Sequence, residues 1–294
     1  MSLNKVRPET PGDVSGGDTG NSPPAGSPEP GRRRRRLDLS ERPEFYLVPL
    51  VFIVTVGLWE IGVQVFDVPA FVLPRPSAIF SALLGNMTDA LFWYNVRVTM
   101  TEALIGYAVG CGIAMALGVA ISQFRLLEKS LMPYVVAFQA IPIVALAPLI
   151  VLWFGFDLTS KVVISALIAF FPLLVNVIEG LRASDPAQLE MLRSFGASRR
   201  QVFVKVRVPN ALPFIFAGLD IAALLALTGA VVGEFVGAKY GLGYLVLQAN
   251  YKFDIAEMFA LLIVLSLMAL LLHFIVKTAQ KRVVFWASDD HHAR

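Results

Sequence analysis

The residues of this chain best suited to chemistry are carboxylates that stand inside long apolar segments. Glu102, Asp220 and Glu234 each fall within or at the end of such a segment. A carboxylate in hydrocarbon is costly, so it usually faces protein or water and often marks a transport pathway. For each of them, as for Glu60 and Glu179, a structural hydrogen bond or a position near the end of a span is the favoured interpretation. Glu102 and Asp220 lie deepest, which makes them the stronger candidates for a polar lining.

Sequence motifs for catalysis are absent. The chain contains no G-x-x-x-x-G-K-[ST] phosphate loop, no G-x-S-x-G nucleophile pattern and no H-E-x-x-H metal motif. Its single cysteine, Cys111, excludes a disulfide or a cysteine-based metal site within one chain. His273 stands alone in the last apolar segment and suggests no site. We therefore predict no catalytic residue, no cofactor and no bound metal, and we expect no nucleic-acid partner.

The composition indicates a helical membrane protein. The 294 residues are 56% hydrophobic and only 16% charged, which leaves too little polar surface for a soluble domain of this length. No series of short alternating segments predicts a transmembrane barrel. Six apolar blocks are each near the ~20 residues that a membrane-spanning helix needs. They cover residues 46–66, 98–121, 131–154, 161–181, 211–233 and 258–276. We expect an all-α, polytopic protein with these six spans in a transmembrane domain of residues 45–285.

Charge sets the expected orientation. Residues 1–44 have no apolar run and include an arginine run at 32–36, which predicts a disordered tail that can also contact anionic lipid. The four segments that hold 20 of the 25 Lys and Arg residues are 1–45, 122–130, 182–210 and 277–294. The positive-inside rule places these segments, and so both termini with the short tail 286–294, in the cytoplasm.

Small residues and prolines predict how the spans pack and bend. Small residues every fourth position let membrane helices approach closely. The three series are Gly106, Gly110, Ala114, Gly118 and Ser122; Gly218, Ala222, Ala226 and Ala230; and Gly229, Gly233 and Gly237. Prolines between residues 139 and 148 free backbone carbonyls that protein or cavity water must satisfy, so this stretch is expected to line a pathway. The predicted pathway residues are Glu102, Gln139, Pro142, Asn176, Asp220 and Glu234.

The charged stretch 182–209 lies between the fourth and fifth apolar blocks and begins with a predicted short helix. Asp185 can cap it, Pro186 suits its first position, and Gln188 can complete a capping box. Gly196 suits the left-handed residue that ends it. Its apolar stripe comprises Leu189, Leu192 and Phe195.

A second, basic helix should follow. Ser198 can cap it, and we expect it to run from Arg199 to Val208 and to end at Pro209. The first of these two helices, which is capped at both ends, is stiff enough to serve as a lever for a separate motor protein. The alternative is an amphipathic helix that lies on the bilayer surface.

The spacing in this stretch resembles that of a known family. Glu190-Met-Leu-Arg-Ser-Phe-Gly196 is followed, after nine residues, by Val206-Arg-Val-Pro209. This is similar to the EAA loop of binding-protein-dependent ABC importer permeases, whose pattern is Glu-Ala-Ala, three residues, Gly, nine residues and Ile-x-Leu-Pro. The departures from that pattern are all apolar and comprise Met191, Leu192, Val206 and Val208.

The resemblance extends over about residues 50–280. The motifs similar to the nitrate/sulfonate/taurine-type branch are Phe71-Val-Leu-Pro-Arg-Pro-Ser77, Ile141-Pro-Ile-Val-Ala-Leu-Ala-Pro-Leu149, Trp153-Phe-Gly155 and Gly241-Leu-Gly243. The resemblance implies a type I importer permease fold (MetI-like) in a bacterial inner membrane. It also implies a permease homodimer, two separate ATPase subunits and an extracytoplasmic binding protein.

The same resemblance implies that residues 184–196 dock on the ATPase. The coupling residues it implies are Asp185, Leu189, Glu190, Leu192, Phe195, Gly196, Ala197 and Pro209. The implied solute belongs to the nitrate/sulfonate/taurine class. The alternative is a vitamin precursor or aromatic compound, such as a pyrimidine thiamin precursor or riboflavin. Permeases for these compounds have some similarity to the stretches Glu234-Phe-Val-Gly-Ala, Gly241-Leu-Gly-Tyr-Leu and Met258-Phe-Ala. An ion-coupled secondary transporter, the alternative of another class, normally has more spans, an internal repeat and a paired-charge site at mid-membrane.

Overall fold

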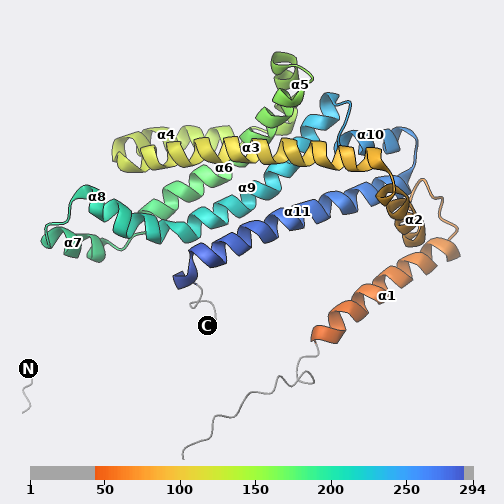
Figure 1. The fold of residues 1–294 in the computed structure, drawn as a ribbon, viewed down its shortest axis with the longest axis horizontal. Coiled ribbons are helices and arrows are strands. Elements are labelled where there is room, and N and C mark those ends of the chain that lie inside the picture. Colours follow the sequence, from red (N-terminus) through yellow and green to blue (C-terminus); the bar gives the residue numbers. More distant parts are fainter. Residues whose placement is uncertain (1–43, 288–294) are drawn as a thin grey trace, which may run out of the picture. The chain divides into compact units, whose positions relative to one another are not determined.

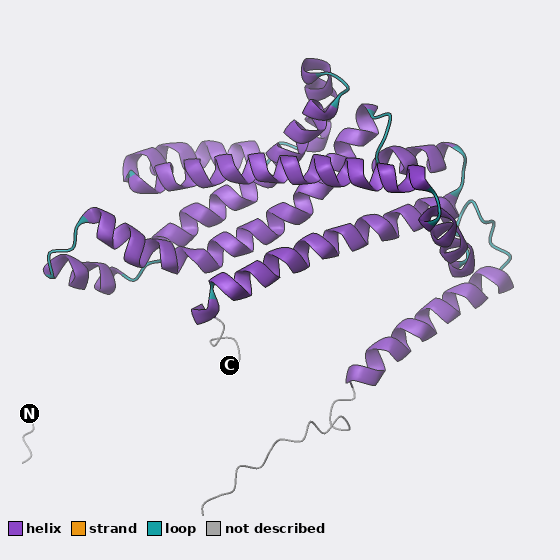
Figure 2. Ribbon diagram, in the orientation of Figure 1, coloured by secondary structure: helices purple, strands orange, loops and turns teal. Residues whose placement is uncertain are grey.

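The computed structural model describes residues 44–287, and within them the chain is helical, with turns between the helices and no strand (Figure 2). The predicted all-α class is confirmed. The expected tails, residues 1–44 and 286–294, lie outside the described residues apart from their inner edges. The packing discussed below is that of the compact unit that begins at Val51.

The helices follow one another along the chain with short connections (Figure 1). They are α1 (Glu44–Val65), α2 (Pro76–Met87), α3 (Ala90–Gln123), α4 (Arg125–Gln139), α5 (Ile143–Phe154), α6 (Leu158–Arg182), α7 (Pro186–Ser194), α8 (Arg199–Val202), a π-helical segment (Phe203–Arg207), α9 (Val208–Gly237), α10 (Leu242–Tyr251), α11 (Ile255–Val283) and a 3₁₀ turn (Phe285–Ala287).

Five stretches of the described chain are long and apolar enough to cross a membrane, and a sixth exists if α4 and α5 count as one broken span. α4 and α5 correspond to the expected span 131–154, but they meet at a 90° bend. The bend falls at Ala140–Pro142, because proline disfavours helical geometry in the residue before it and lacks the N–H that would continue the ladder. The short helices α2 and α10 were not expected.

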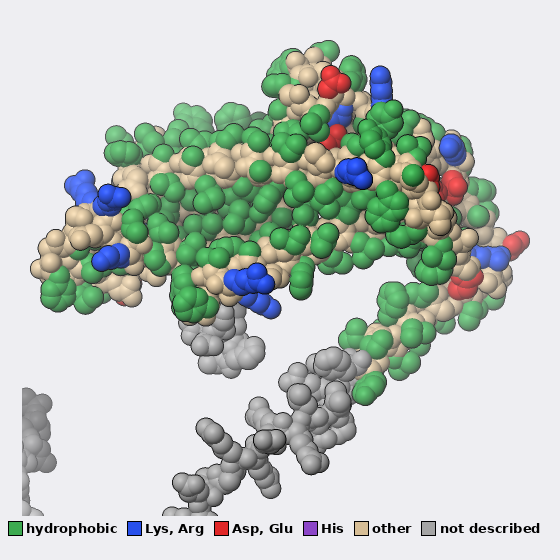
Figure 3. Space-filling model, in the orientation of Figure 1, with side chains coloured by type: hydrophobic (Ala, Val, Ile, Leu, Met, Phe, Trp, Pro, Cys, Tyr) green, Lys and Arg blue, Asp and Glu red, His purple; other side chains and the backbone are tan. Residues whose placement is uncertain are grey.

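α6 forms the centre of the bundle and packs along α3 on one side and α9 on the other (Figure 1). Its side chains Ile164, Leu173, Leu174 and Ile178 are among the most deeply buried of the chain. On the face shown in Figure 3, apolar side chains cover most of the bundle, while charged side chains gather toward its two ends. This distribution is the one that a membrane imposes, since lipid meets the middle of each helix and water meets the ends.

The small residues lie where α6 meets its neighbours, which confirms the predicted packing role. A Cβ atom on Gly106 would stand 2.3 Å from the hydroxyl oxygen of Ser165 in α6. On the other side, a Cβ atom on Gly229 of α9 would stand 2.7 Å from the Cα atom of the same Ser165. Ser165 in turn donates a 2.8 Å hydrogen bond to the carbonyl of Ala226. The glycines thus bring three helix backbones into direct contact.

Replacing Gly110 with alanine should loosen this contact. The added methyl group would stand 2.4 Å from the carbonyl oxygen of Ala166, a rigid backbone atom. Overpacking of this kind costs about 1–3 kcal/mol of stability. Gly112, in the same helix, provides the matched control, because a methyl group added there would have nothing within 4 Å. Thermal unfolding of the purified protein should show a lower midpoint for Gly110→Ala than for Gly112→Ala; equal midpoints would contradict the packing.

Candidate functional site

The first candidate site is the helical hairpin formed by α7 and α8. The Ala187 N–H donates a 2.9 Å hydrogen bond to the Asp185 carboxylate, which caps α7 as predicted. Gly196 adopts the predicted left-handed conformation, with φ of 76°. The Ala197 N–H then donates to the carbonyl of Leu192 at 3.0 Å, a bond that closes the helix end. Local capping chemistry therefore sets both ends of α7.

The second half of the hairpin differs from the prediction. Ser198 and Gln201 form a reciprocal capping box that starts α8. The prediction that Pro209 ends this helix is wrong, because α8 continues through the π-helical segment into α9. In an α-helix the proline ring would clash with the carbonyl four residues earlier, here that of Lys205. That carbonyl lies in the π-helical segment, whose wider turn accommodates the ring.

α7 is mostly exposed, and only Leu189 and Leu192 in it are half-buried. None of its residues is buried, and Met191 and the adjoining Phe195 are 54% and 81% exposed. The predicted coupling residues from Asp185 to Ala197 all lie on α7 and its two ends, whereas Pro209 lies in the first turn of α9. The hairpin projects from one end of the bundle, where basic side chains gather (Figures 1 and 3). It is thus an ordered helical element with exposed apolar side chains.

The second candidate site surrounds Glu234, near the opposite end of α9. Its side chain is only 1% exposed. One carboxylate oxygen accepts hydrogen bonds from the backbone N–H groups of Gly243 and Tyr244, in the first turn of α10. The other accepts a 2.6 Å hydrogen bond from the Thr99 hydroxyl of α3. Glu234 therefore caps α10, where the helix dipole favours a negative charge.

Two α3 side chains complete this connection. The Gly241 N–H donates to the side-chain oxygen of Asn95 at 2.6 Å, and the Leu242 N–H donates to the Thr99 hydroxyl oxygen at 2.8 Å. Gly241 has φ of 117°, and a Cβ atom there would stand 2.3 Å from the carboxyl carbon of Glu234. Only glycine fits this approach. The α10 turn is thereby fastened to α3 and α9.

Lys161 ties the start of α6 to the same region. Its ammonium group donates to the backbone carbonyls of Phe156, Asp157 (3.1 Å) and Gly237 (3.3 Å). Lys161 is only 3% exposed. The backbone oxygens that surround its ammonium group make this burial possible, because they replace the hydrogen bonds of water.

A cavity of about 460 Å³ opens beside these groups. Glu102 and Lys161 contribute to its wall, and the rings of Tyr94 and Tyr240 meet edge to face at 5.2 Å along it. Glu102 is 4% exposed and lies close to Glu234. These two predicted pathway residues are therefore neighbours at the α10 end of the bundle.

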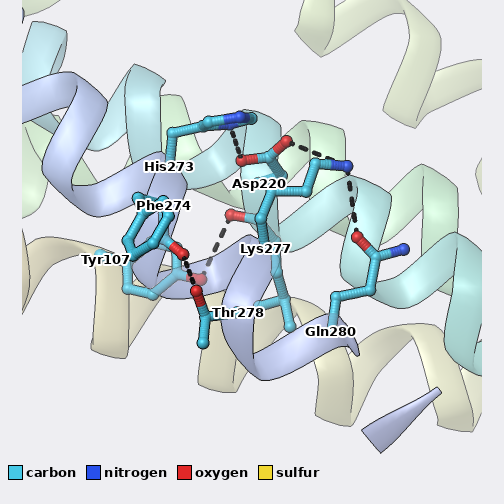
Figure 4. A network of polar contacts seen from close by, with 8 residues as sticks. Tyr107, Asp220, His273, Phe274, Lys277, Thr278 and Gln280 are labelled. Atoms are coloured by element: carbon cyan, nitrogen blue, oxygen red, sulfur yellow. Dashed lines mark hydrogen bonds and ion pairs between the residues drawn. The ribbon is translucent and has the colours of Figure 1, made fainter. Parts of the chain in front are cut away.

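Asp220 belongs to a separate network between α9 and α11 (Figure 4). One carboxylate oxygen lies 2.6 Å from Nδ1 of His273, and the other lies 3.7 Å from the ammonium of Lys277. Lys277 also donates to Gln280 at 3.2 Å. The sequence did not lead us to expect a partner for Asp220 at His273. The spacing of four residues between His273 and Lys277, which places both on one helix face, could have indicated it. Asp220 and Glu102 thus take part in different networks.

The two partners of Asp220 should differ in importance. Because the imidazole approaches more closely than the ammonium, we expect His273→Leu to cost about 1 kcal/mol of stability and Lys277→Leu less. Both side chains are similarly exposed, at 41% and 42%, so each variant controls for lost burial in the other. Thermal unfolding in detergent provides the measurement. A larger loss for Lys277→Leu would show that the ion pair, and not the short hydrogen bond, holds Asp220.

The remaining predicted pathway residues lie elsewhere. Gln139 and Pro142 stand at the bend between α4 and α5 and are exposed. Asn176 is half-buried in α6, where its amide donates a 2.8 Å hydrogen bond to the carbonyl of Pro172. Within this one chain, the six predicted pathway residues do not converge on a single cavity.

Residues 108–287 match the protein family described as the inner membrane component of binding-protein-dependent transport systems. The chain belongs to this family. It is a multi-pass membrane protein and the permease component of an ABC importer, a transporter rather than an enzyme. Membership implies ATPase partners and a solute-binding protein, as the EAA-type spacing had indicated.

The permease is similar along most of its length to curated relatives. It is 39% identical over 87% of its length to the riboflavin transport system permease protein RibX of Chloroflexus aurantiacus, of which 96% is covered. It is 34% identical to the formylaminopyrimidine transport permease protein ThiX of Halalkalibacterium halodurans, over 81% of this chain and 94% of that one. It is 28% identical to the putative aliphatic sulfonates transport permease protein SsuC of Bacillus subtilis, over 83% and 87%.

A solved structure confirms the predicted fold. The permease aligns with a chain of the inward-facing MetNI methionine ABC transporter at a TM-score of 0.58, covering 65% of this chain and 95% of that chain. The identity is 23%, so the likeness concerns the fold alone.

Proposed function

We propose that this permease imports a heteroaromatic solute, such as a flavin or a pyrimidine vitamin precursor. The observation that carries this proposal is the ranking of its relatives. Identity is 39% to the riboflavin permease and 34% to the formylaminopyrimidine permease, against 28% and 27% to the sulfonate and taurine permeases. The sulfonate/taurine class, which the sequence motifs had placed first, becomes the second candidate.

The proposed mechanism uses α7 as the coupling helix. Two copies of the permease form a homodimer, and each α7 docks on one of two ATPase subunits, with Glu190 and Gly196 at the positions that match the EAA pattern. The capped ends of α7 support this role, because a helix fixed at both ends transmits a push that a flexible loop would absorb. Its exposed apolar side chains, Met191 and Phe195, offer the contact area.

We further propose that the α7–α8 end and both termini face the cytoplasm, and that the membrane is a bacterial inner membrane. The excess of Lys and Arg in the α7–α8 hairpin supports this orientation. The α10 end, with the cavity of about 460 Å³, then faces the binding protein. Glu102, Gln139, Pro142, Asn176, Asp220 and Glu234 remain our candidates for the pathway between the two permease copies.

Uptake by the assembled transporter tests the solute class. Proteoliposomes would contain the permease with its ATPase and internal ATP, with the partner binding protein and one labelled solute outside. We expect accumulation of riboflavin or formylaminopyrimidine and none of taurine. Accumulation of taurine alone would establish the second candidate. Uptake that persists without the ATPase would instead identify an ion-coupled secondary transporter and refute the ABC mechanism.

Substitution in α7 tests the coupling role. We expect Glu190→Ala and Gly196→Val to abolish transport while the amount of permease in the membrane stays unchanged and ATPase recruitment is lost. Glu179→Ala, at an exposed glutamate in α6, is the matched control. Normal ATPase recruitment by both α7 variants would show that the coupling contact lies elsewhere.

A further inference from the structure

A polar cavity of about 560 Å³ lies between α7 and the ends of the long helices. Its wall includes Ser122 and Gln123 at the end of α3, Arg182 at the end of α6 and Arg207 just before α9. α7 closes it from the other side with Arg193. Its volume lies within the range of about 300–1,000 Å³ that small-molecule sites occupy.

The cavity is positively charged. Three arginines, Arg182, Arg193 and Arg207, line it together with a single acidic side chain, Glu190. Arg182 already takes part in another interaction within the protein. The two cations considered for a ligand are therefore Arg193 and Arg207. Among the described residues, neither of these two forms an ion pair, although Arg207 is half-buried. Arg193 is exposed, so of the two it is the half-buried Arg207 that gains most from an anion that offsets lost water.

A second, smaller cavity of about 270 Å³ extends the positive region. It shares Gln123, Arg193 and Arg207 with the first cavity and adds Arg199 from α8. The guanidinium groups of α7, α8 and the segment before α9 therefore face a common space. Guanidinium groups have the planar fork that binds phosphate oxygens in pairs.

Ser184 supplies an independent sign that a ligand belongs there. The residue lines the first cavity and is only 6% exposed, yet its hydroxyl has no hydrogen-bond partner among the described residues. Buried hydroxyl groups are nearly always satisfied, since an unmade hydrogen bond costs free energy. A hydroxyl next to arginines completes the donor set that a phosphate group requires.

We propose that this cavity binds a phosphate group, and that the phosphate is the headgroup of an anionic phospholipid. The position favours a lipid over a free ion, because the ends of three membrane-spanning helices line the cavity and so set it at headgroup depth. Such a lipid connects Arg193 of α7 to Arg207 and Ser184 beside the spans. It braces the coupling helix against the membrane domain.

The orientation proposed above places this lipid in the inner leaflet, and it affects nothing else about the site. Lipid binding itself depends neither on that orientation nor on the transported solute. A permease that transports sulfonates, or that inserts the other way, would still bind the lipid at this cavity. The two proposals therefore fail separately.

Native mass spectrometry of the permease–ATPase complex, titrated with phosphatidylglycerol, tests the site. We expect the double variant Arg193→Gln/Arg207→Gln to bind the lipid at least about tenfold more weakly than the wild type, as expected for lost hydrogen bonds between charged groups. Ser184→Ala should weaken binding less. Arg200→Gln removes an exposed arginine that lines neither cavity and should leave binding unchanged. Equal binding by all four proteins would refute the proposal.

A measurement with inorganic phosphate separates the lipid from a free anion. Inorganic phosphate is added to complexes in nanodiscs of pure phosphatidylcholine, and the thermal midpoint is recorded. Stabilisation by phosphate that needs Arg193 and Arg207, without binding of phosphatidylglycerol, would overturn the lipid source in favour of a free phosphate.

The third possible occupant is an acidic side chain of the ATPase. In lipid-free detergent, loss of the ATPase from the double variant, with no effect of either phosphatidylglycerol or phosphate on the wild type, would refute the proposal and assign the cavity to the ATPase. Retention of the ATPase together with an arginine-dependent lipid effect is the result that supports it.

Discussion

Glu234→Ala should be the most destabilising single substitution at the α10 end of the bundle. The variant leaves the Gly243 and Tyr244 N–H groups and the Thr99 hydroxyl without their acceptor. Because the site is 1% exposed, water cannot easily replace the carboxylate. Unpaired buried donors of this kind cost about 2–4 kcal/mol in total. Thermal unfolding of the purified permease should show a midpoint lower by roughly 5–10 °C.

Two further variants sharpen this prediction. Glu234→Gln keeps one acceptor oxygen but places an amide NH₂ against backbone donors, so its midpoint should fall between those of the wild type and the alanine variant. Glu179→Gln changes an exposed glutamate and should leave the midpoint unchanged. A stable Glu234→Ala protein that has lost only transport would show that the carboxylate serves the pathway and not the fold.

Phe195→Ala should cause the largest loss of ATPase binding among truncations of apolar side chains in α7 and its caps. Phe195 is 81% exposed at the C-terminal end of α7, where an aromatic ring can enter a pocket on a partner. Truncation of such an anchor typically costs about 2 kcal/mol or more, equivalent to about thirtyfold weaker binding. Co-purification of the ATPase with the permease, at several ATPase concentrations, gives the affinity.

Phe285→Ala is the matched control for that experiment. Phe285 is 72% exposed in the 3₁₀ turn after α11, so its truncation removes a similar exposed aromatic ring outside the proposed docking helix. We expect it to bind the ATPase as the wild type does, and both variants should keep the wild-type thermal midpoint because neither ring is buried. Equal losses of affinity in the two variants would contradict a specific role of Phe195.

Features with local causes were predictable from the sequence. The class and most of the spans follow from runs of apolar residues, which must be helical in lipid because each backbone group is satisfied within its own helix. The ends of α7 follow from Asp185 and Gly196, whose capping interactions involve residues only a few positions away. The small residues of α3 and α9 indicated close packing by their spacing alone. The membership of the family followed from the order and spacing of short motifs.

Features that depend on distant residues required the tertiary structure. Glu234 caps α10 and also accepts a hydrogen bond from Thr99 of α3, which lies 135 residues away in the chain. Asp220 meets His273 across two helices, and no local pattern links a carboxylate to an imidazole 53 residues later. The continuation of the helix through Pro209 depended on the π-helical segment, which capping rules do not foresee.

The intramembrane carboxylates illustrate this division. Their positions in apolar segments of the sequence established that Glu102, Asp220 and Glu234 must be accommodated by protein or water. Which partner accommodates each of them is a matter of helix packing: Glu234 holds the turn of α10, Glu102 lies beside it, and Asp220 joins α9 to α11. Periodicity specifies which face of a helix is apolar or small. The pairing of faces is decided only when α3, α6, α9 and α11 assemble, because the free energy of each contact depends on both helices at once.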